Sequence, residues 1–292
     1  MKRACVAGAS GYLGSFLVRE LKKQGYRVRV IARDRTRLGE IADIADETVI
    51  AQVTDPSTLN GVCSDVDVLL STVGITKQKD GLTFMDVDYQ ANINLLDEAK
   101  KNGVRKFIYV SVFNAERMRH LKSVQAKIRF GEALAASGME HSIVYPNGFF
   151  SDMREYLTMA RKGRGYVFGS GEKRINPIHG ADLAEVCVSA IPGHAREIAV
   201  GGPDILTHND ILRLAFAALD KPAKISRIPL WICSAAIATL RACTSIKTYG
   251  PIEFFMTVLS HDMVAPAHGT RHLADFYAEL ADESNRQVST SA

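Results

Sequence analysis

Three glycines near the N-terminus set the strongest limit on how this chain folds. They form Gly8-Ala-Ser-Gly11-Tyr-Leu-Gly14, between an apolar run at Ala4–Ala7 and a helical pattern at Leu13–Gln24. At such a strand–turn–helix junction, glycines allow a sharp turn, a close approach of the backbone to a pyrophosphate, and tight packing of helix on strand. The amide groups at the helix start then receive the anion. The alternative is a tight turn without a ligand. We predict a dinucleotide site at Gly8, Ser10, Gly11, Tyr12, Leu13 and Gly14.

The first half of the chain alternates short β-branched runs with helical patterns. This alternation predicts right-handed βαβ units and a doubly wound, parallel α/β sheet of the Rossmann type. The expected strands are Ala4–Ala7, Arg27–Ala32, Thr48–Val53, Val66–Val73, Lys106–Val112 and His141–Tyr145. The clearest helices are Leu13–Gln24, Phe84–Asn102 and Val124–Ser137.

The rhythm of strands and helices changes after Pro146, which predicts a second, smaller lobe. Residues 1–150 are expected to form the dinucleotide-binding domain, to which the chain returns at about residues 180–202. Residues 203–283, together with 151–179, are expected to form a mainly helical substrate lobe, followed by a flexible tail at 284–292. Ligands of doubly wound sheets bind at the carboxyl ends of the strands.

The end of the second expected strand indicates which dinucleotide binds. An acidic side chain there would hold the ribose hydroxyls of NAD(H), whereas a cationic one accepts the 2′-phosphate of NADP(H). Here Arg33 comes directly after the strand, and a guanidinium suits a phosphate. We predict NADP(H), with NAD(H) as the alternative if Asp34 only pairs with a neighbouring arginine in a solvated loop. The first 37 residues contain ten Lys or Arg and two acidic residues, and we expect this excess near the phosphates.

Further cofactor contacts are expected where later strands end. They are Asp55 after the third strand, Thr72, Val73 and Gly74 after the fourth, and Pro146, Gly148 and Phe149 after the sixth. Asp55 is placed to reach the adenine. Gly148 would let the backbone approach the nicotinamide, and Phe149 would line the pocket around it. Each of these positions is also an ordinary boundary between a strand and a loop.

Together these motifs resemble the atypical short-chain dehydrogenase/reductase family, in which NmrA-like and isoflavone-reductase-like members are nearest in kind. The resemblance covers residues 1–200 through GASGYLG, VRVIARD, QVTDP, VDYQANINLLDEAKKNGVRKFIYVSV, AKIRFGEALAASG and YPNGFF. A later stretch, Asp262–Thr270 followed by Leu273–Phe276, resembles the tail of the divinyl chlorophyllide reductase group, which reduces a vinyl substituent with NADPH. The resemblance implies an oxidoreductase that binds NADP(H) and acts on a hydrophobic small molecule.

The same resemblance assigns the catalytic role to Lys127. Members of the family usually carry Tyr-x-x-x-Lys, in which the lysine lowers the tyrosine pKa and holds the nicotinamide ribose. Lys127 occupies the lysine position, but Ser123 stands where the tyrosine would be. The resemblance then favours reduction of an activated C=C or C=O bond, and disfavours a sugar-nucleotide epimerase. The alternatives are a catalytically silent NADP(H) sensor or accessory subunit, with Lys127 a plain surface lysine. Tyr109, on an expected strand, is predicted to be core.

Other features exclude further classes of function. The formal net charge of +4 over 292 residues gives no reason to expect a nucleic-acid partner. The five cysteines are widely spaced and form no CxxC pair, which favours the cytoplasm and no metal site.

The apolar run at 228–240 is shorter than the roughly 20 residues of a spanning helix. It is open to contact with a membrane surface or a protein, or to burial within the lobe, where we expect Trp231 and Phe255 as core. The sequence specifies no oligomeric state.

Overall fold

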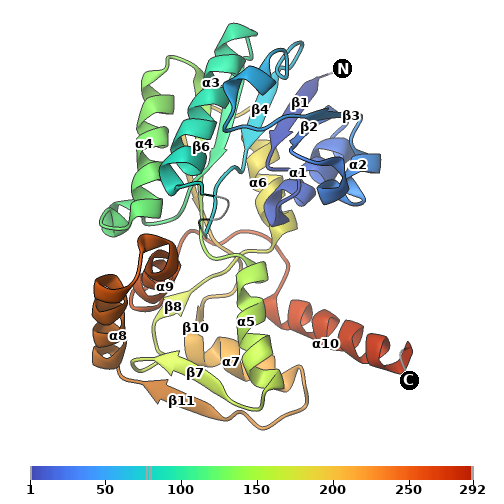
Figure 1. Cartoon of the computed structure of the whole chain (residues 1–292). Coiled ribbons are helices and arrows are strands. Elements are labelled where there is room, and N and C mark those ends of the chain that lie inside the picture. The colour runs from blue at the N-terminus through green and yellow to red at the C-terminus, as the bar shows by residue number, and fades with distance from the viewer. Residues whose placement is uncertain (1, 77, 79–80, 291–292) are drawn as a thin grey trace. The chain divides into compact units, whose positions relative to one another are not determined.

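Figure 1 shows the computed structural model of the chain, which describes residues 2–76, 78 and 81–290. The chain forms two compact units. The first contains Met1–Tyr145 and Leu183–Ala199, and the second contains Pro146–Asp182 and Val200–Ala292. The chain therefore passes from the first unit into the second and back before it ends in the second.

A seven-stranded sheet forms the centre of the first unit. Its strands are β1 (Arg3–Ala7), β2 (Arg27–Ala32), β3 (Glu47–Ile50), β4 (Val68–Ser71), β5 (Lys106–Val110), β6 (Glu140–Pro146) and β9 (Glu197–Val200). They follow the order β3-β2-β1-β4-β5-β6-β9, and the neighbours from β3 to β6 pair in parallel. The strand order reverses between β1 and β4, as it does in doubly wound sheets. The predicted fold class is confirmed.

Helices cover both faces of this sheet. They are α1 (Tyr12–Lys23), α2 (Ile41–Ile44), α3 (Ala91–Lys101), α4 (Lys122–Ala136) and α6 (Gly180–Ser189), with the 3-10 turns η1 (Arg35–Leu38), η2 (Pro56–Leu59) and η4 (Ala115–Met118). The expected helix at 84–102 begins instead with a π-helical turn, η3 (Met85–Gln90), which leads into α3.

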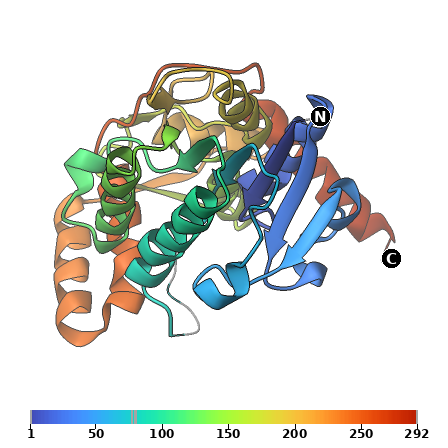
Figure 2. The ribbon, with the colours of Figure 1, turned by 90° about the horizontal axis from the view of Figure 1, so that it is seen from above.

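Alternate residues of each strand point to opposite faces of the sheet. On one face, Cys5, Leu69 and Phe107 join Leu95 of α3 and Phe130 of α4 in a buried apolar cluster. The residues between them point to the other face, and α1 contacts β1 and β2. Figure 1 shows α3 and α4 on one side of the strands and α1 on the other, and Figure 2 shows the same elements from above. The core of this unit therefore lies on both faces of the central strands.

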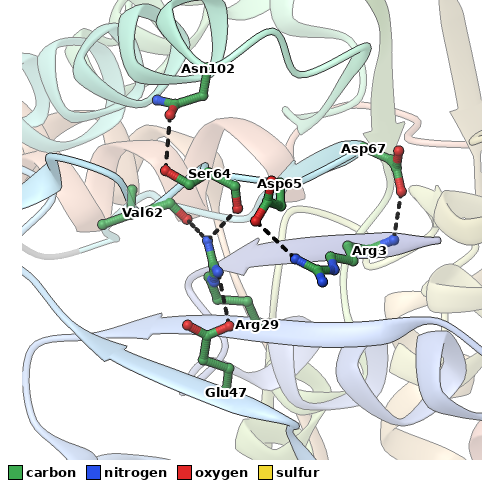
Figure 3. Close-up of polar contacts among 8 residues, drawn as sticks. All are labelled: Arg3, Arg29, Glu47, Val62, Ser64, Asp65, Asp67 and Asn102. Carbon is green, nitrogen blue, oxygen red and sulfur yellow. Dashed lines mark hydrogen bonds and ion pairs between the residues drawn. The ribbon is translucent and has the colours of Figure 1, made fainter. Parts of the chain in front are cut away.

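Charged residues of β1 and β2 are held by ion pairs and hydrogen bonds (Figure 3). Arg29 Nη2 lies 2.9 Å from a carboxylate oxygen of Glu47. Nη1 of the same arginine donates to the carbonyls of Val62 and Ser64 at 2.8 and 3.0 Å. Arg3 Nη1 lies 3.1 Å from a carboxylate oxygen of Asp65. These contacts connect the strands to the loop that precedes β4.

These contacts correct our expectation about the N-terminal basic excess. Five of its ten basic residues form ion pairs with carboxylates: Arg3, Arg19, Lys22, Lys23 and Arg29. Most of these carboxylates come from other segments, which folding brings beside the basic side chains. Much of the excess is therefore neutralised locally. Only Arg33, Arg35 and Arg37 follow the carboxyl end of β2.

The second unit combines helices with two small sheets. Its helices are α5 (Phe150–Arg161), α7 (His208–Ala217), α8 (Leu230–Cys243), α9 (Ile246–Leu259) and α10 (Leu273–Thr290). One sheet pairs β8 (Arg174–Ile175) with β10 (Leu206–Thr207), and the other pairs β7 (Gly165–Phe168) with β11 (Ile225–Ile228). These strands are not predictable from the sequence, because each has only two or four residues, too few for a clear alternating pattern.

The stretch that resembles the divinyl chlorophyllide reductase tail crosses the second unit before α10. Met263 forms a β-bridge with Ile175 of β8, and Ala267 forms one with Gly201. Helix α10 then continues to Thr290, within the segment 284–292 that the sequence predicts to be a flexible tail. The last two residues of that segment lie outside the described residues.

Helices α8 and α9 correct the expectation that their aromatic residues form core. Trp231 of α8 is 72% exposed and Phe255 of α9 is 40% exposed. The two helices contact each other, which leaves their other faces on the surface of the unit. Within the part of the chain that the structure describes, none of the helices combines the length and apolar character needed to cross a membrane.

Candidate functional site

The turn between β1 and α1 is a cradle made of backbone. Gly8 has a φ of +89°, and a Cβ there would lie 2.4 Å from Thr72 Oγ1. A Cβ on Gly14 would lie 2.1 Å from the carbonyl oxygen of Gly8. The N–H of Gly11 donates to that same carbonyl at 2.9 Å. Positions 8 and 14 therefore require glycine, as the sequence predicts for a turn that closely approaches a ligand.

The start of α1 suits an anion. Gly11 is the N-cap, so the helix has no side-chain cap, and its first turn contains no acidic residue. Ser10 and Gly11 are exposed, Tyr12 is half-buried, and Leu13 and Gly14 are buried. The amide groups and the dipole of such a helix start favour a phosphate. The glycine turn therefore fits the pyrophosphate of a dinucleotide.

Arg33 lies at the carboxyl end of β2 with its charge exposed. Its guanidinium forms no hydrogen bond or ion pair with the described residues. The neighbouring carboxylate of Asp34 instead accepts the N–H of Thr36 at 2.9 Å and caps η1. This hydrogen bond also holds the pKa of Asp34 below its ordinary value. Asp34 is thus engaged locally, and Arg33 is accessible to a phosphate.

Asp55 also has a local structural role. Its carboxylate accepts the N–H of Ser57 at 3.0 Å and the hydroxyl of Ser57 at 2.7 Å. It is thereby the N-cap of η2, which is a common use of aspartate. Its expected contact with an adenine stays a prediction.

The segment after β4 contacts the glycine turn on one side and α3 on the other. Thr72 Oγ1 lies 3.3 Å from the carbonyl oxygen of Gly8. The fully buried Asn92 accepts the Ser71 hydroxyl at 2.5 Å and donates to the carbonyl of Val73 at 3.2 Å. Asn92 therefore fixes the path of the predicted segment Thr72–Gly74.

Lys127 of α4 and Asp88 of η3 form an ion pair beside Gly74. Lys127 Nζ lies 2.7 Å from Asp88 Oδ1, and the lysine side chain is 20% exposed whereas the aspartate is fully buried. A Cβ on Gly74 would lie 2.6 Å from that Nζ and 2.7 Å from that Oδ1. Asp88 also accepts the N–H of Ile75 at 3.2 Å. Gly74 and Lys127, which the sequence predicts separately, therefore meet around Asp88.

The pKa values of Asp88 and Lys127 are both raised, but for different reasons. Burial raises the pKa of Asp88, and the nearby ammonium only partly offsets that rise. Burial alone would lower the pKa of Lys127, but the Asp88 carboxylate outweighs it and raises that pKa. Lys127 therefore stays an ammonium at neutral pH. In this state it donates hydrogen bonds and does not act as a base.

Sequence reasoning missed Asp88 and Asn92. The two residues are four apart, and Leu95 and Ala99 continue the same helical face. All four side chains are buried. Two polar residues on an otherwise apolar helical face indicate a buried polar site, and this pattern can be seen in the sequence. The π-helical turn at Asp88 is consistent with a functional site, where such turns are frequent.

Tyr109 does not replace the tyrosine that Ser123 displaces. It is fully buried, as predicted, and its ring packs edge-on against Phe130 at 4.6 Å between centroids. Its hydroxyl has no hydrogen-bond partner among the described residues. Burial raises the pKa of Tyr109 to about 12, so this hydroxyl is a poor proton donor. Ser123 lies one helical turn before Lys127 in α4.

Of the remaining predicted residues, Pro146 is the last residue of β6, and Gly148 and Phe149 follow it; all three belong to the second unit. Asn147 fixes their path. Its Nδ2 donates to Asn176 Oδ1 at 2.7 Å, and its Oδ1 accepts the N–H of Gly148 at 2.9 Å. A Cβ on Gly148 would lie 3.1 Å from Ile175 Cδ1, so packing favours glycine here. The expected contacts of these residues with a nicotinamide stay predictions.

Comparison with known proteins shows the family of this chain. The sequence matches the family described as NAD(P)H-binding over residues 8–192. It is 30% identical to a protein of Oryza sativa subsp. indica named divinyl chlorophyllide a 8-vinyl-reductase, chloroplastic, over 95% of this chain and 78% of that protein. It is 26% identical to the photosystem II assembly factor Ycf39 of Guillardia theta, over 77% of this chain and 73% of that protein.

A solved structure shows the same fold. The NADPH-dependent quinone oxidoreductase QOR2 of Escherichia coli, in complex with NADPH, superimposes with a TM-score of 0.72 at 17% identity. The similarity covers 95% of this chain and 99% of that one. The family match contains both the glycine turn and Lys127, and the relatives agree with the resemblance found in the motifs. The chain therefore belongs to the NAD(P)H-binding family, among atypical short-chain dehydrogenase/reductase relatives that include divinyl chlorophyllide reductases and Ycf39 proteins.

Proposed function

We propose that the protein is an NADP(H)-dependent reductase of a hydrophobic small molecule. The observation that carries this proposal is the Lys127–Asp88 ion pair of 2.7 Å at the carboxyl end of β4. A single short segment connects it to the glycine turn, because Thr72 contacts Gly8 and Gly74 contacts Lys127. The glycine turn and the fixed ammonium thus lie at the carboxyl ends of neighbouring strands. There the turn would bind the pyrophosphate of a nicotinamide dinucleotide, and the ammonium would bind its nicotinamide ribose.

Each part of this edge has a defined task in the proposed reaction. When bound, NADP(H) supplies the hydride. The glycine turn and the start of α1 bind the pyrophosphate. The Lys127 ammonium donates hydrogen bonds to the nicotinamide ribose and keeps its proton at Nζ. Asp88 holds that ammonium in place. We therefore assign Lys127 to orientation of the ribose rather than to proton relay.

Arg33 supports NADP(H) over NAD(H). Its guanidinium is exposed at the position where a 2′-phosphate is expected, and Asp34 is occupied in capping η1. A carboxylate free to bind ribose hydroxyls would support NAD(H). The solved relative in complex with NADPH also supports this preference.

An activated C=C or C=O bond is the group that we propose the enzyme reduces. Ser123 is a much poorer proton donor than the usual tyrosine, which disfavours ordinary exchange between alcohol and ketone. An activated bond depends less on an acid, because conjugation stabilises the negative charge that hydride addition creates. The names of two relatives, a vinyl reductase and a quinone oxidoreductase, support substrates of this kind.

A second candidate is a silent NADP(H)-binding accessory protein. Ser123 and the inaccessible hydroxyl of Tyr109 favour it, because neither is a good proton donor. The relative named as an assembly factor supports it as well. For either candidate we propose a cytoplasmic location, in line with cysteines that are all free thiols, and no nucleic-acid partner.

Binding and turnover distinguish the two candidates. Purified protein is titrated with NADPH and NADH, and NADPH oxidation is followed by absorbance against enones, quinones and vinyl tetrapyrroles. The reductase proposal expects oxidation with at least one class, and loss of that activity in Lys127→Ala. Lys122→Ala is the matched control, since Lys122 is exposed on the same helix. Binding without oxidation across the panel supports the accessory protein, and absence of binding overturns both.

A further inference from the structure

Helices α8 and α9 form a hairpin with an unusual outer surface. Their contact is reinforced by an ion pair between Arg241 and Glu253. On α8, the buried or half-buried residues are Cys233, Ile237 and Leu240, whose spacing places them on one inner face. The rest of α8 is exposed.

The outer faces of both helices are uncharged. On α8, Trp231, Ala235, Ala238 and Ala242 are exposed and follow one another at helical spacing. On α9, Thr248, Ile252 and Phe255 do the same. Five large apolar residues of the hairpin are 40–72% exposed, namely Leu230, Trp231, Ile232, Ile252 and Phe255; we call them the hairpin surface. A surface helix normally presents polar residues to water, so this surface requires a cover.

Most charged residues in and beside the hairpin in the sequence are positive. Residues 221–260 contain five Lys or Arg and one acidic residue, Glu253. That residue is buried and paired with Arg241. Lys224 and Arg227 precede α8, and Lys247 lies in the first turn of α9; all three are exposed. In the described part of the chain, no ion pair neutralises these three cations.

We propose that the hairpin surface docks on an anionic lipid bilayer, with α8 and α9 lying in the plane of the headgroups. Each helix has 14 residues and is therefore about 21 Å long, less than the hydrocarbon core of about 30 Å. Apolar side chains with flanking cations are the two features that hold a helix in the interface. Trp231 suits this region, because an indole prefers the boundary between headgroups and acyl chains.

Charge favours a lipid surface over a second copy of this chain. A symmetric dimer through the hairpin surface would bring the Lys224, Arg227 and Lys247 of both copies to the rim of one interface. These like charges repel one another, whereas anionic headgroups attract them. Salt is expected to weaken the docking, because the flanking cations are exposed and therefore screened.

Trp231 reports this docking directly, because it is the only tryptophan of the chain. The full chain is mixed with phosphatidylcholine vesicles, with or without phosphatidylglycerol, and tryptophan emission and co-flotation are recorded. We expect a blue shift and flotation with the anionic vesicles, a weaker response with phosphatidylcholine alone, and quenching by lipids brominated on their acyl chains. No shift and no flotation with anionic vesicles overturns the proposal.

Charged substitutions locate the contact. Ile232→Asp and Phe255→Asp each keep Trp231 and should weaken vesicle binding about tenfold, which corresponds to about 1.4 kcal/mol of binding free energy. Ile205→Asp is the matched control, since Ile205 is 52% exposed in the same unit but outside the hairpin, and it should bind as the parent does. Circular dichroism checks that each variant is folded. Equal binding by all the variants overturns the proposal, as does sedimentation that shows a dimer through this surface without lipid.

Discussion

The ammonium of Lys127 lies 2.7 Å from the carboxylate of Asp88, and the aspartate has no exposed side-chain surface. The two residues come from α4 and from the π-helical turn η3. A buried carboxylate that binds one ammonium holds that ammonium in a fixed position. The activity of Lys127 should therefore depend on Asp88 even though we assign Asp88 no contact with cofactor or substrate.

Asp88→Asn should lower kcat/KM for NADPH oxidation about 10- to 100-fold, or about 1.4–2.8 kcal/mol of transition-state stabilisation. Loss of the carboxylate also removes the charge that raises the Lys127 pKa, while burial still lowers it. The alkaline limb of the pH–rate profile should therefore move to lower pH. Asp86→Asn is the matched control, because Asp86 lies on the same turn but is only half-buried and accepts the Thr83 hydroxyl. An unchanged alkaline limb in Asp88→Asn would remove Asp88 from the site.

Gly74→Ala should disrupt the same pair by steric contact alone. The added Cβ would lie 2.6 Å from Lys127 Nζ and 2.7 Å from Asp88 Oδ1, so the ammonium must move. We expect reduced turnover and weaker NADPH binding. Gly131→Ala, one helical turn after Lys127, adds a Cβ that would meet only Ile143 at 3.4 Å, and helix propensity should make it neutral or stabilising by up to about 1 kcal/mol. Equal activity of the two variants would contradict the proposed geometry.

The features that the sequence predicted correctly are those written in local patterns. The glycine turn, the parallel βαβ units and the helix that contains Lys127 can each be recognised from a short segment. The partner of Lys127 was missed because Asp88 meets it only after η3 and α4 pack together. The same limit applies to Arg3 and Arg29, whose carboxylate partners come from distant segments. Trp231 was misplaced because apolar composition does not say which face of a helix is covered.

Arg33→Ser should change the cofactor preference. A charge-assisted hydrogen bond contributes about 1.5–3 kcal/mol, so the Kd for NADPH should rise about 10- to 100-fold. The Kd for NADH should change little, because NADH has no 2′-phosphate. Arg105→Ser is the control, since Arg105 is exposed just before β5, at the other end of the strands. Fluorescence titration measures both constants. A similar loss for NADPH and NADH would refute the assignment of Arg33 to the 2′-phosphate.

His208 of the second unit should make folding stability fall at mildly acidic pH. Its Nδ1 lies 2.8 Å from the hydroxyl of Tyr156, and its buried Nε2 has no partner among the described residues. Burial lowers the pKa of His208 to about 4, below its value of about 6.5 in an unfolded chain. The folded state thus binds the proton less readily than the unfolded state, so the contribution of His208 is full above about pH 6.5 and is lost as the pH falls toward 4.

Between pH 7.5 and 5 the loss should be about 2 kcal/mol in the free energy of unfolding, measured by urea denaturation. His208→Gln should remove this part of the pH dependence, whereas His194→Gln, at an exposed position, should keep it. A parent protein that is equally stable at both pH values would show that His208 accepts a proton in the folded state.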